Sequence, residues 1–432
     1  MKRIENLSNK VFRSSFAKKI AWIAGGTAFA QAMNIIFLPI ITRLYPPEQY
    51  GILTVYSAAL ALLAIAASLD YQKAIPIAED EEKAIILLTL SMIVLLIFSC
   101  ILTIMLYLWG DTMLVMLGNE ALLKYKYLVP VGVFFTGSYN IVLQWALRLR
   151  DYKAIAQTQI SQGIWSNLFK VILGFFKVGP IGLIYGTILG QSAGLTTLAL
   201  PILQKKEIIK KISTKDIVSL ANRYFKFPVY SAPSNYVYTA GTQIPIIFLT
   251  LIFGSSVVGL FGLANSIVRM PVNLIGSSVA QVFYSEAAYI GRSNPEELKR
   301  LSIKLIKKLA IIGLVPLIIL LCFGPWLFSF VFGSQWYEAG VYARIISIMV
   351  YFHFIILPIG RILEIFERQR DGLLLNILRL ALIFVVFVIA KFMELDSYQT
   401  VILYSIVTSS TYLFSLIIVQ FIIKCEIEKR NR

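Results

Sequence analysis

Charged residues are scarce in this chain, and apolar residues dominate it. Only 15% of the 432 residues are Asp, Glu, Lys or Arg, whereas 58% are apolar. A soluble domain carries about 25% charged residues, so this composition excludes a soluble globular protein. Apolar runs of about 20 residues instead predict a polytopic membrane protein built from α-helices.

Residues that usually carry catalysis or hold metals are also rare. The chain has one histidine, His353, and three cysteines. It contains no GxxxxGK[ST] phosphate loop, no HExxH or GxSxG motif and no metal-ligand spacing. We therefore expect a protein that is not an enzyme, has no cofactor and is not driven by ATP within this chain.

Acidic residues are missing from the middle of the apolar runs, whereas three basic residues are found there. Lys170, Arg269 and Arg379 each lie deep in a run. A cation at the centre of a bilayer costs about 2.5 to 3.5 kcal/mol on insertion scales, so we expect these side chains to face a protected cavity. Their common sign indicates an anionic cargo.

Twelve runs are long enough to cross a membrane. They cover residues 20–42, 51–75, 85–109, 127–147, 158–178, 180–203, 228–252, 257–285, 307–331, 341–365, 372–392 and 398–423. Basic residues gather in alternate loops, which places both termini in the cytoplasm by the positive-inside rule. The net charge of +17 thus reflects membrane orientation and does not indicate a nucleic-acid partner.

Short strings recur in the two halves of the chain. Segment 42–53 is similar to 250–261, and segment 148–151 is similar to 368–371. Six predicted helices separate the copies, so the two halves have the same orientation in the membrane. The repeat predicts an N-terminal six-helix lobe over 1–204, a basic cytoplasmic linker over 205–226 and a C-terminal six-helix lobe over 227–432.

Polar residues form stripes at helical spacing on several predicted spans. The stripe of the first span recurs 208 residues later in the seventh, and spans five and eight carry longer stripes around Lys170 and Arg269. Such residues either bond to neighbouring helices or line a shared cavity, and matched stripes in both halves favour the cavity. The polar residues expected to line it are Gln31, Asn34, Asn235, Thr239, Asn265 and Asn273.

The string LPIITRLYPPEQYG, residues 38–51, resembles the signature between helices one and two of O-antigen and capsular oligosaccharide-lipid flippases. Those polysaccharide biosynthesis proteins belong to the multidrug, oligosaccharidyl-lipid and polysaccharide (MOP) exporter superfamily. Segment 148–151 and the Met270-Pro271 step are also similar to that family. The resemblance implies a V-shaped, MATE-like pair of six-helix lobes around a cationic lumen.

The resemblance also implies a function. The chain would flip undecaprenyl-pyrophosphate-linked oligosaccharides, the repeat units of O-antigen or capsule, across a bacterial inner membrane by alternating access. Arg43, Lys170, Arg269 and Arg379 would attract the pyrophosphate, because basic side chains bind phosphate oxygens. The expected partners are this lipid, membrane lipids and the polymerase and chain-length components of polysaccharide assembly, and we expect a monomer coupled to a sodium or proton gradient.

Two other classes of protein stay open. A cation-coupled multidrug antiporter of the same superfamily would need a buried carboxylate, which the apolar runs do not supply. A membrane-embedded polysaccharide polymerase or ligase would normally carry a long outer loop, and the longest here, 110–126, is short. A proton route would have to use His353, Asp70 or Glu364, for which packing or interfacial pairing is the simpler role.

Overall fold

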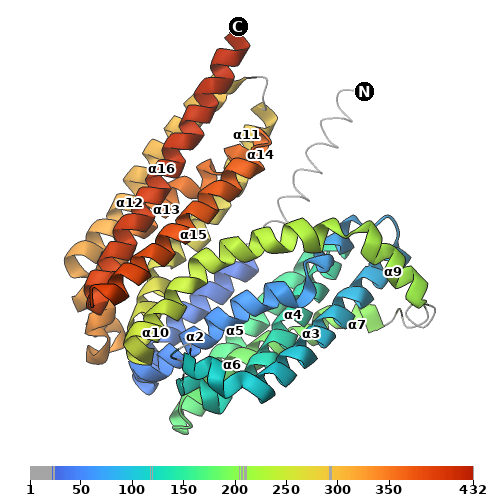
Figure 1. The fold of residues 1–432 in the computed structure, drawn as a ribbon, viewed down its shortest axis with the longest axis horizontal. Coiled ribbons are helices and arrows are strands. Elements are labelled where there is room, and N and C mark those ends of the chain that lie inside the picture. The colour runs from blue at the N-terminus through green and yellow to red at the C-terminus, as the bar shows by residue number, and fades with distance from the viewer. Residues whose placement is uncertain are drawn as a thin grey trace. The chain divides into compact units, whose positions relative to one another are not determined.

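The computed structural model describes residues 22, 25–116, 118, 120–203, 205, 208, 212–290 and 294–431. These residues form helices joined by turns and contain no β-strand (Figure 1). The expected all-α membrane architecture is therefore confirmed. The basic N-terminal segment, and Lys206, Lys210 and Lys211 of the expected linker, lie outside the described residues.

The helices follow one another along the chain as serial membrane crossings. The first half contains the helix Gly25–Leu44, α2 (Pro47–Ser68), α3 (Glu81–Met116), α4 (Leu128–Leu149), α5 (Tyr152–Phe175), α6 (Pro180–Ser192) and α7 (Leu195–Leu203). After α9 (Thr214–Arg223) come α10 (Ala232–Pro271), α11 (Ser277–Ile290), α12 (Pro295–Phe332), α13 (Tyr337–Ile359), α14 (Ile362–Ile365), α15 (Gln369–Phe392) and α16 (Ser397–Asn431). Short 3₁₀ segments are η1 (Tyr71–Ile77), η2 (Glu120–Tyr125) and η5 (Ser334–Trp336), and η3 (Phe227–Ser231) and η4 (Val272–Gly276) are π-helices.

Each expected membrane span has a helical counterpart in the described part of the chain. Nine helical stretches there are long and apolar enough to cross a membrane. The stretch Phe227–Ile290 contains two crossings, because Gly254 adopts a non-helical backbone with φ 81°. The helices α4 and α5 fall below that hydropathy because they carry polar side chains. Together these helices account for twelve spans.

Several span ends differ from the sequence-based expectation. The second span was predicted to reach residue 75, but α2 ends at Ser68, and Leu69 and Asp70 adopt left-handed conformations before η1. The sixth span was predicted to be one helix, but it is divided into α6 and α7 next to Gly194. The break in the sixth span falls where apolar composition continues, so hydropathy alone does not mark it, whereas Asp70, Gln72 and Lys73 follow the end of α2.

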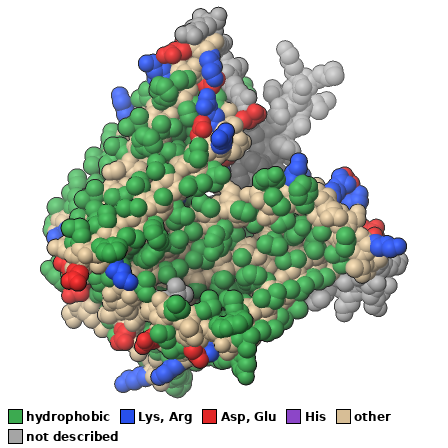
Figure 2. All heavy atoms as spheres, in the orientation of Figure 1, with side chains coloured by type: hydrophobic (Ala, Val, Ile, Leu, Met, Phe, Trp, Pro, Cys, Tyr) green, Lys and Arg blue, Asp and Glu red, His purple; other side chains and the backbone are tan. Residues whose placement is uncertain are grey.

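Apolar side chains cover the outer surface of the helices, and charged side chains gather at their ends (Figure 2). Large exposed apolar residues occur along α3 and α12, among them Ile101, Ile104, Phe323 and Phe330. In water such surfaces would be a liability. In a bilayer they meet lipid tails, which agrees with a multi-pass membrane protein.

The chain forms two compact units. Unit 1 comprises residues 1–45 and 55–239, and unit 2 comprises residues 46–54 and 240–432. Consequently α2 begins in unit 2 and continues in unit 1, whereas α10 begins in unit 1 and continues in unit 2. The lobe boundaries drawn from the sequence repeat stay a prediction.

Specific contacts explain why these two helices change units. Gly51 of α2 packs against the backbone of Ser255, and Gly259 of α10 packs against the backbone of Pro47. The two glycines are 208 positions apart, and so are Pro47 and Ser255, which is the spacing of the sequence repeat. The two contacts are reciprocal, as two-fold symmetry requires, and they hold the start of α2 in unit 2.

The structure also refines the register of the repeat. The helices α5 and α15 each have 24 residues, and their first residues are 217 positions apart. Left-handed residues flank both helices at the same spacing, Arg150 and Glu367 before them and Lys177 and Glu394 after them. The sequence match of 148–151 with 368–371 has a spacing of 220, so it is shifted by three residues from the helical register.

The helix α9 lies in the expected linker and begins with a capping box. The Ser213 side chain accepts a hydrogen bond from the Asp216 amide, and the Asp216 carboxylate accepts bonds from Ser213. These bonds hold the pKa of the Asp216 carboxyl below its usual range. At its other end, Arg223 pairs with Glu79, which attaches α9 to the start of α3.

Candidate functional site

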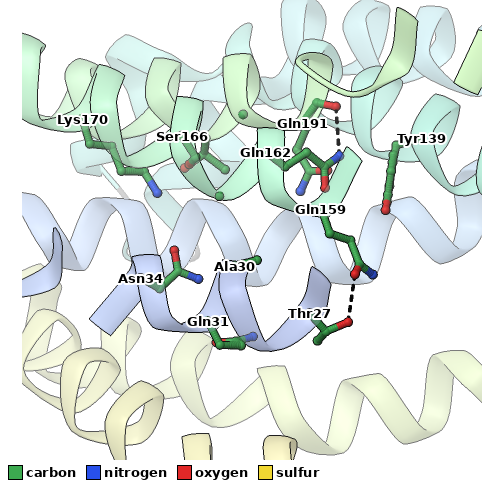
Figure 3. A pocket seen from close by; sticks show the side chains of 13 residues that line it. Thr27, Ala30, Gln31, Asn34, Tyr139, Gln159, Gln162, Ser166, Lys170 and Gln191 are labelled. Carbon is green, nitrogen blue, oxygen red and sulfur yellow. Dashed lines mark hydrogen bonds between the residues drawn. The ribbon is translucent and has the colours of Figure 1, made fainter. Parts of the chain in front are cut away.

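A polar pocket of about 350 Å³ lies within unit 1, between the helix Gly25–Leu44 and the helices α4, α5 and α6 (Figure 3). Three of the residues predicted to bind substrate line it, namely Gln31, Asn34 and Lys170. The remaining lining residues are Thr27, Ala30, Tyr139, Gln159, Gln162, Gly163, Ser166, Thr187, Gly190 and Gln191. Amides and hydroxyls thus dominate the wall, and Lys170 supplies its one charge.

Small residues bring the helix Gly25–Leu44 against α5. A methyl group added at Gly26 would lie 2.7 Å from the Cα atom of Ala156, and one added at Gly163 would lie 3.2 Å from the Cα atom of Ala30. Small residues four apart allow two membrane helices to approach this closely. The close approach places the polar stripes of both helices on the same pocket.

A ladder of four glycines packs α6 and the turn after it against neighbouring helices. Gly182 faces the hydroxyl of Tyr45, Gly186 faces the Lys170 side chain, Gly190 faces Ser166 and Gly194 faces Thr158. A methyl group at Gly186 would lie 2.5 Å from the Cγ atom of Lys170. The glycines therefore leave room for the side chains of α5 that form the pocket wall.

Hydrogen bonds hold several of the pocket side chains. The Thr27 hydroxyl donates to the Gln159 side-chain oxygen at 2.8 Å, and the Gln162 amide donates to the Gln191 carbonyl at 3.3 Å (Figure 3). The buried Asn167 amide donates to the Asn34 side-chain oxygen at 2.7 Å. These bonds fix amide groups around the pocket before any ligand binds.

Lys170 places its ammonium in the pocket, pointing toward the helix that carries Asn34 (Figure 3). No described residue forms an ion pair or hydrogen bond with this ammonium. The backbone carbonyl of Lys170 accepts a bond from the Tyr45 hydroxyl at 2.8 Å, which anchors this turn of α5. A positive charge held in this way can attract an anion.

Arg379 lies in unit 2 in a much more crowded setting. Its side chain is 9% exposed, donates to the Asn376 side-chain oxygen at 3.1 Å and to the Tyr412 hydroxyl at 3.4 Å, and lies 5.5 Å from the centre of the Tyr412 ring. The single histidine, His353, stacks on the same ring at 5.0 Å. Arg379 is thus part of a packed cluster.

Arg269 and Asn265 form a pair on α10. The Arg269 Nε atom donates to the Asn265 side-chain oxygen at 2.7 Å, and no described residue forms an ion pair with Arg269. Two residues later Pro271 ends α10, and the π-helix η4 follows. Asn273 lies in η4 with an exposed side chain. π-Helical turns often accompany functional sites.

The other predicted residues lie elsewhere. Arg43 is exposed near the end of the first helix, outside the pocket. Asn235 is at the start of α10, where its side chain donates to Asp70, and half-buried Thr239 follows one turn later. The structure therefore brings Gln31, Asn34 and Lys170 together, and does not place the other seven predicted residues in the same pocket.

Asp70 is a buried carboxylate that the sequence did not reveal. Its side chain is 3% exposed and accepts bonds from Ser231 at 2.7 Å, from Asn235 and from Lys73 at 2.9 Å. These three donors satisfy the carboxylate within unit 1. They also fix the start of α10 to the turn after α2.

Some members of the pocket were missed because no stripe marked them. Tyr139, Thr187 and Gln191 come from α4 and α6, which contribute isolated polar residues. The four glycines at steps of four in residues 182–194 were a usable signal, because such spacing marks a close helix contact. That signal would have identified α6 as the neighbour of α5.

The fold is similar to those of solved MOP superfamily transporters. The chain is 16% identical to an inward-facing multidrug resistance MATE family transporter, with a TM-score of 0.75 over 93% of this chain and 96% of that one. It is 12% identical to the lipid II flippase MurJ in an inward closed conformation, with a TM-score of 0.74 over 92% and 87%. A Pyrococcus furiosus MOP transporter, whose binding pocket has reverse polarity, is 15% identical, with a TM-score of 0.63 over 95% and 96%.

At these identities the likeness establishes the fold alone, and no curated protein sequence matches the chain. The family follows from a different comparison. Residues 40–341 match the family described as "Polysaccharide biosynthesis protein", and the chain belongs to that family. The resemblance seen in residues 38–51 is thereby confirmed.

Proposed function

We propose that the chain is a flippase for undecaprenyl-pyrophosphate-linked oligosaccharides, moving O-antigen or capsule repeat units from the cytoplasmic to the outer leaflet of a bacterial inner membrane. It works by alternating access, with both termini in the cytoplasm. The observation that carries the proposal is the unit 1 pocket, in which one unpaired lysine stands among amides and hydroxyls.

The pocket suits both ends of such a headgroup. A pyrophosphate is an anion with several acceptor oxygens, and the Lys170 ammonium offers charge-assisted hydrogen bonds to it. Sugar hydroxyls both donate and accept, as do the side-chain amides of Gln31, Asn34 and Gln162. The lipid tail needs no pocket, because it can remain in the bilayer.

The charge of the pocket disfavours a multidrug antiporter. A site for cationic drugs needs a carboxylate, and the lining residues include neither Asp nor Glu. The buried Asp70 does not supply one, because Lys73, Ser231 and Asn235 already bond to it. The function therefore rests on binding an anion.

The proposed function implies an energy source for transport and partner proteins that receive the product. Moving an anionic headgroup outward needs a driving force, which a sodium or proton gradient or the membrane potential can supply at about 2.3 kcal/mol per charge and 100 mV. The chain would pass its product to the polymerase and chain-length components of polysaccharide assembly.

Replacement of Lys170 tests the proposal. Lys170→Ala should lower export of the surface polysaccharide at least about tenfold, because a charge-assisted hydrogen bond contributes about 1.5 to 3 kcal/mol, and lipid-linked oligosaccharide should accumulate in the inner leaflet. Lys170→Arg should keep partial activity. Lys177→Ala is the matched control, because Lys177 is exposed and lies two residues after the end of the same helix. Normal export by Lys170→Ala, at normal protein abundance, would refute the proposal.

A further inference from the structure

A second cavity, a groove of about 370 Å³, lies in unit 2 between α12 and α16. It shares no residue with the Lys170 pocket. Its walls are Lys299 from α12 and Leu416, Ile417, Gln420, Phe421 and Lys424 from α16. The proposed transport mechanism uses none of these residues.

A hydrogen-bond chain forms the floor of this groove. The Gln420 amide donates to the Ser302 hydroxyl at 3.2 Å, and that hydroxyl donates to the Lys299 carbonyl at 2.8 Å. Ser302 is fully buried, so these bonds fix α12 against α16 at this level. The positions of Lys299 and Gln420 are therefore set by the fold.

The walls combine two chemistries. Ile417 and Phe421 are 58% and 59% exposed and present an apolar surface. Lys424 lies 3.8 Å from Glu428, a loose exposed pair, and no described residue forms an ion pair with Lys299. Two ammonium groups thus border an apolar strip, which matches a ligand with an anionic head and an apolar chain.

The sequence of α16 indicates the depth of the groove in the membrane. Its apolar run ends at Ile423, and Lys424, Glu426 and Glu428 follow. The groove therefore lies where the hydrocarbon layer meets the headgroups, on the side that the positive-inside rule assigns to the cytoplasm. Basic pockets between membrane helices on that side bind anionic lipid headgroups.

We infer that this groove binds one anionic phospholipid of the cytoplasmic leaflet. Its phosphate lies between the ammonium groups of Lys299 and Lys424, and one acyl chain lies along Ile417 and Phe421. A peptide or soluble anion fits less well, because the exposed apolar strip is covered by the bilayer.

Native mass spectrometry of the full-length protein in detergent tests this site. The wild-type protein should retain one phosphatidylglycerol more tightly than phosphatidylcholine. The double variant Lys299→Gln/Lys424→Gln should lose about 30-fold in affinity for phosphatidylglycerol, because each lysine contributes about fivefold. The control Lys307→Gln/Lys308→Gln removes the same charge from exposed positions of α12 outside the groove and should change the affinity by less than about threefold. Equal losses in both variants would overturn the site.

A second variant separates the lipid from other phosphate ligands. Ile417→Ala/Phe421→Ala keeps both charges and should weaken phosphatidylglycerol binding about tenfold through lost apolar contact, while glycerol phosphate should not compete in either protein. Competition by glycerol phosphate would show a simple anion site and refute the inference. Preferential binding of undecaprenyl phosphate over phosphatidylglycerol would assign the groove to the carrier lipid and also refute it. None of these measurements depends on export activity.

Discussion

The helices α5 and α15 have the same length and the same flanking left-handed residues, yet they make different sites. In the register of 217 positions, Gln159 and Gln162 of α5 correspond to Asn376 and Arg379 of α15. Both helices therefore carry polar groups at the same two positions. The difference between the two helices lies in the residues one and two turns further along.

Further along, α5 has Ser166 and Lys170 where α15 has Ile383 and Phe387. Ser166 and Lys170 line the pocket, whereas Ile383 and Phe387 are buried, and Phe387 stacks on Phe248 at 5.2 Å. At the positions where α5 borders the pocket in unit 1, α15 therefore carries apolar side chains that pack in the core of unit 2. The comparison teaches that a shared backbone frame gives either a binding pocket or a structural cluster, depending on a few side chains.

The strongest test of this comparison changes the glycine ladder. Gly190→Leu should destabilise the protein by about 3 kcal/mol or more, because the added side chain collides with Ser166. Val407→Leu, at the corresponding position of α16, is the control and should cost less than about 1 kcal/mol. Protein abundance and thermal aggregation in detergent measure both. Equal stability of the two variants would show that the ladder does not set the α5–α6 distance.

Arg269→Ala should abolish polysaccharide export while protein abundance stays near normal. The side chain has one amide partner and no described ion pair, so its charge is available to the cargo. Arg269→Lys should retain partial export. Normal transport by Arg269→Ala would refute the prediction that Arg269 binds the cargo.

Arg379→Ala should act on stability more than Lys170→Ala does. It removes bonds to Asn376 and Tyr412 in a buried cluster, a loss of about 2 to 3 kcal/mol, whereas Lys170 has no such partners. Thermal unfolding of the two purified variants tests the difference. If Lys170→Ala proved less stable than Arg379→Ala, the assignment of Lys170 to a pocket and of Arg379 to a packed cluster would be wrong.

Cysteine labelling tests which polar stripes are accessible to water. With Cys100, Cys322 and Cys425 replaced, single cysteines at Gln31, Asn235, Thr239 and Asn265 should react with an impermeant thiol reagent when the cavity is open to it. Cysteines at Leu249, which is buried, and at Ile312, on an apolar surface, should stay unlabelled. Equal labelling of both sets would show that the stripes do not line an aqueous cavity.

The smallest effect is expected at His353. Its ring stacks on Tyr412, so we expect a packing role, and His353→Phe should transport nearly as well as the wild type. Transport in vesicles with an imposed membrane potential, with and without a pH gradient, tests this. Strict dependence on the pH gradient, lost in the variant, would make His353 a proton carrier.

The sequence was sufficient to predict the class of fold and much of the pocket. Apolar windows in the sequence predicted a helix for each span, because a bilayer imposes length and composition on each helix, but they misplaced the end of the second span and missed the break in the sixth. The predicted stripe of the fifth span comprised Gln159, Gln162, Ser166, Lys170 and Lys177. The first four line the pocket, since helical periodicity is a local property, whereas Lys177 lies beyond the end of α5.

What the sequence did not predict depends on contacts between distant residues. Asp70 lies near a helix end, and its burial follows from Ser231 and Asn235, more than 160 positions away. Lys170 and Arg379 are both deep cations in the sequence, yet only the neighbours supplied by other helices separate a pocket residue from a clustered one. The roles of Arg43, Asn273 and the other predicted residues outside the pocket stay predictions.

The reciprocal crossing of Gly51 and Gly259 also bears on the history of the chain. In a dimer of two identical halves, one glycine would meet the backbone of the partner copy, and the partner's glycine would meet its own, across a two-fold axis. A single codon would then have specified both contacts. In one chain that carries both halves, each contact has its own codon, so a change at one glycine meets a neighbour that does not change with it. The crossing therefore restrains how far the two halves can diverge, however different their binding surfaces become.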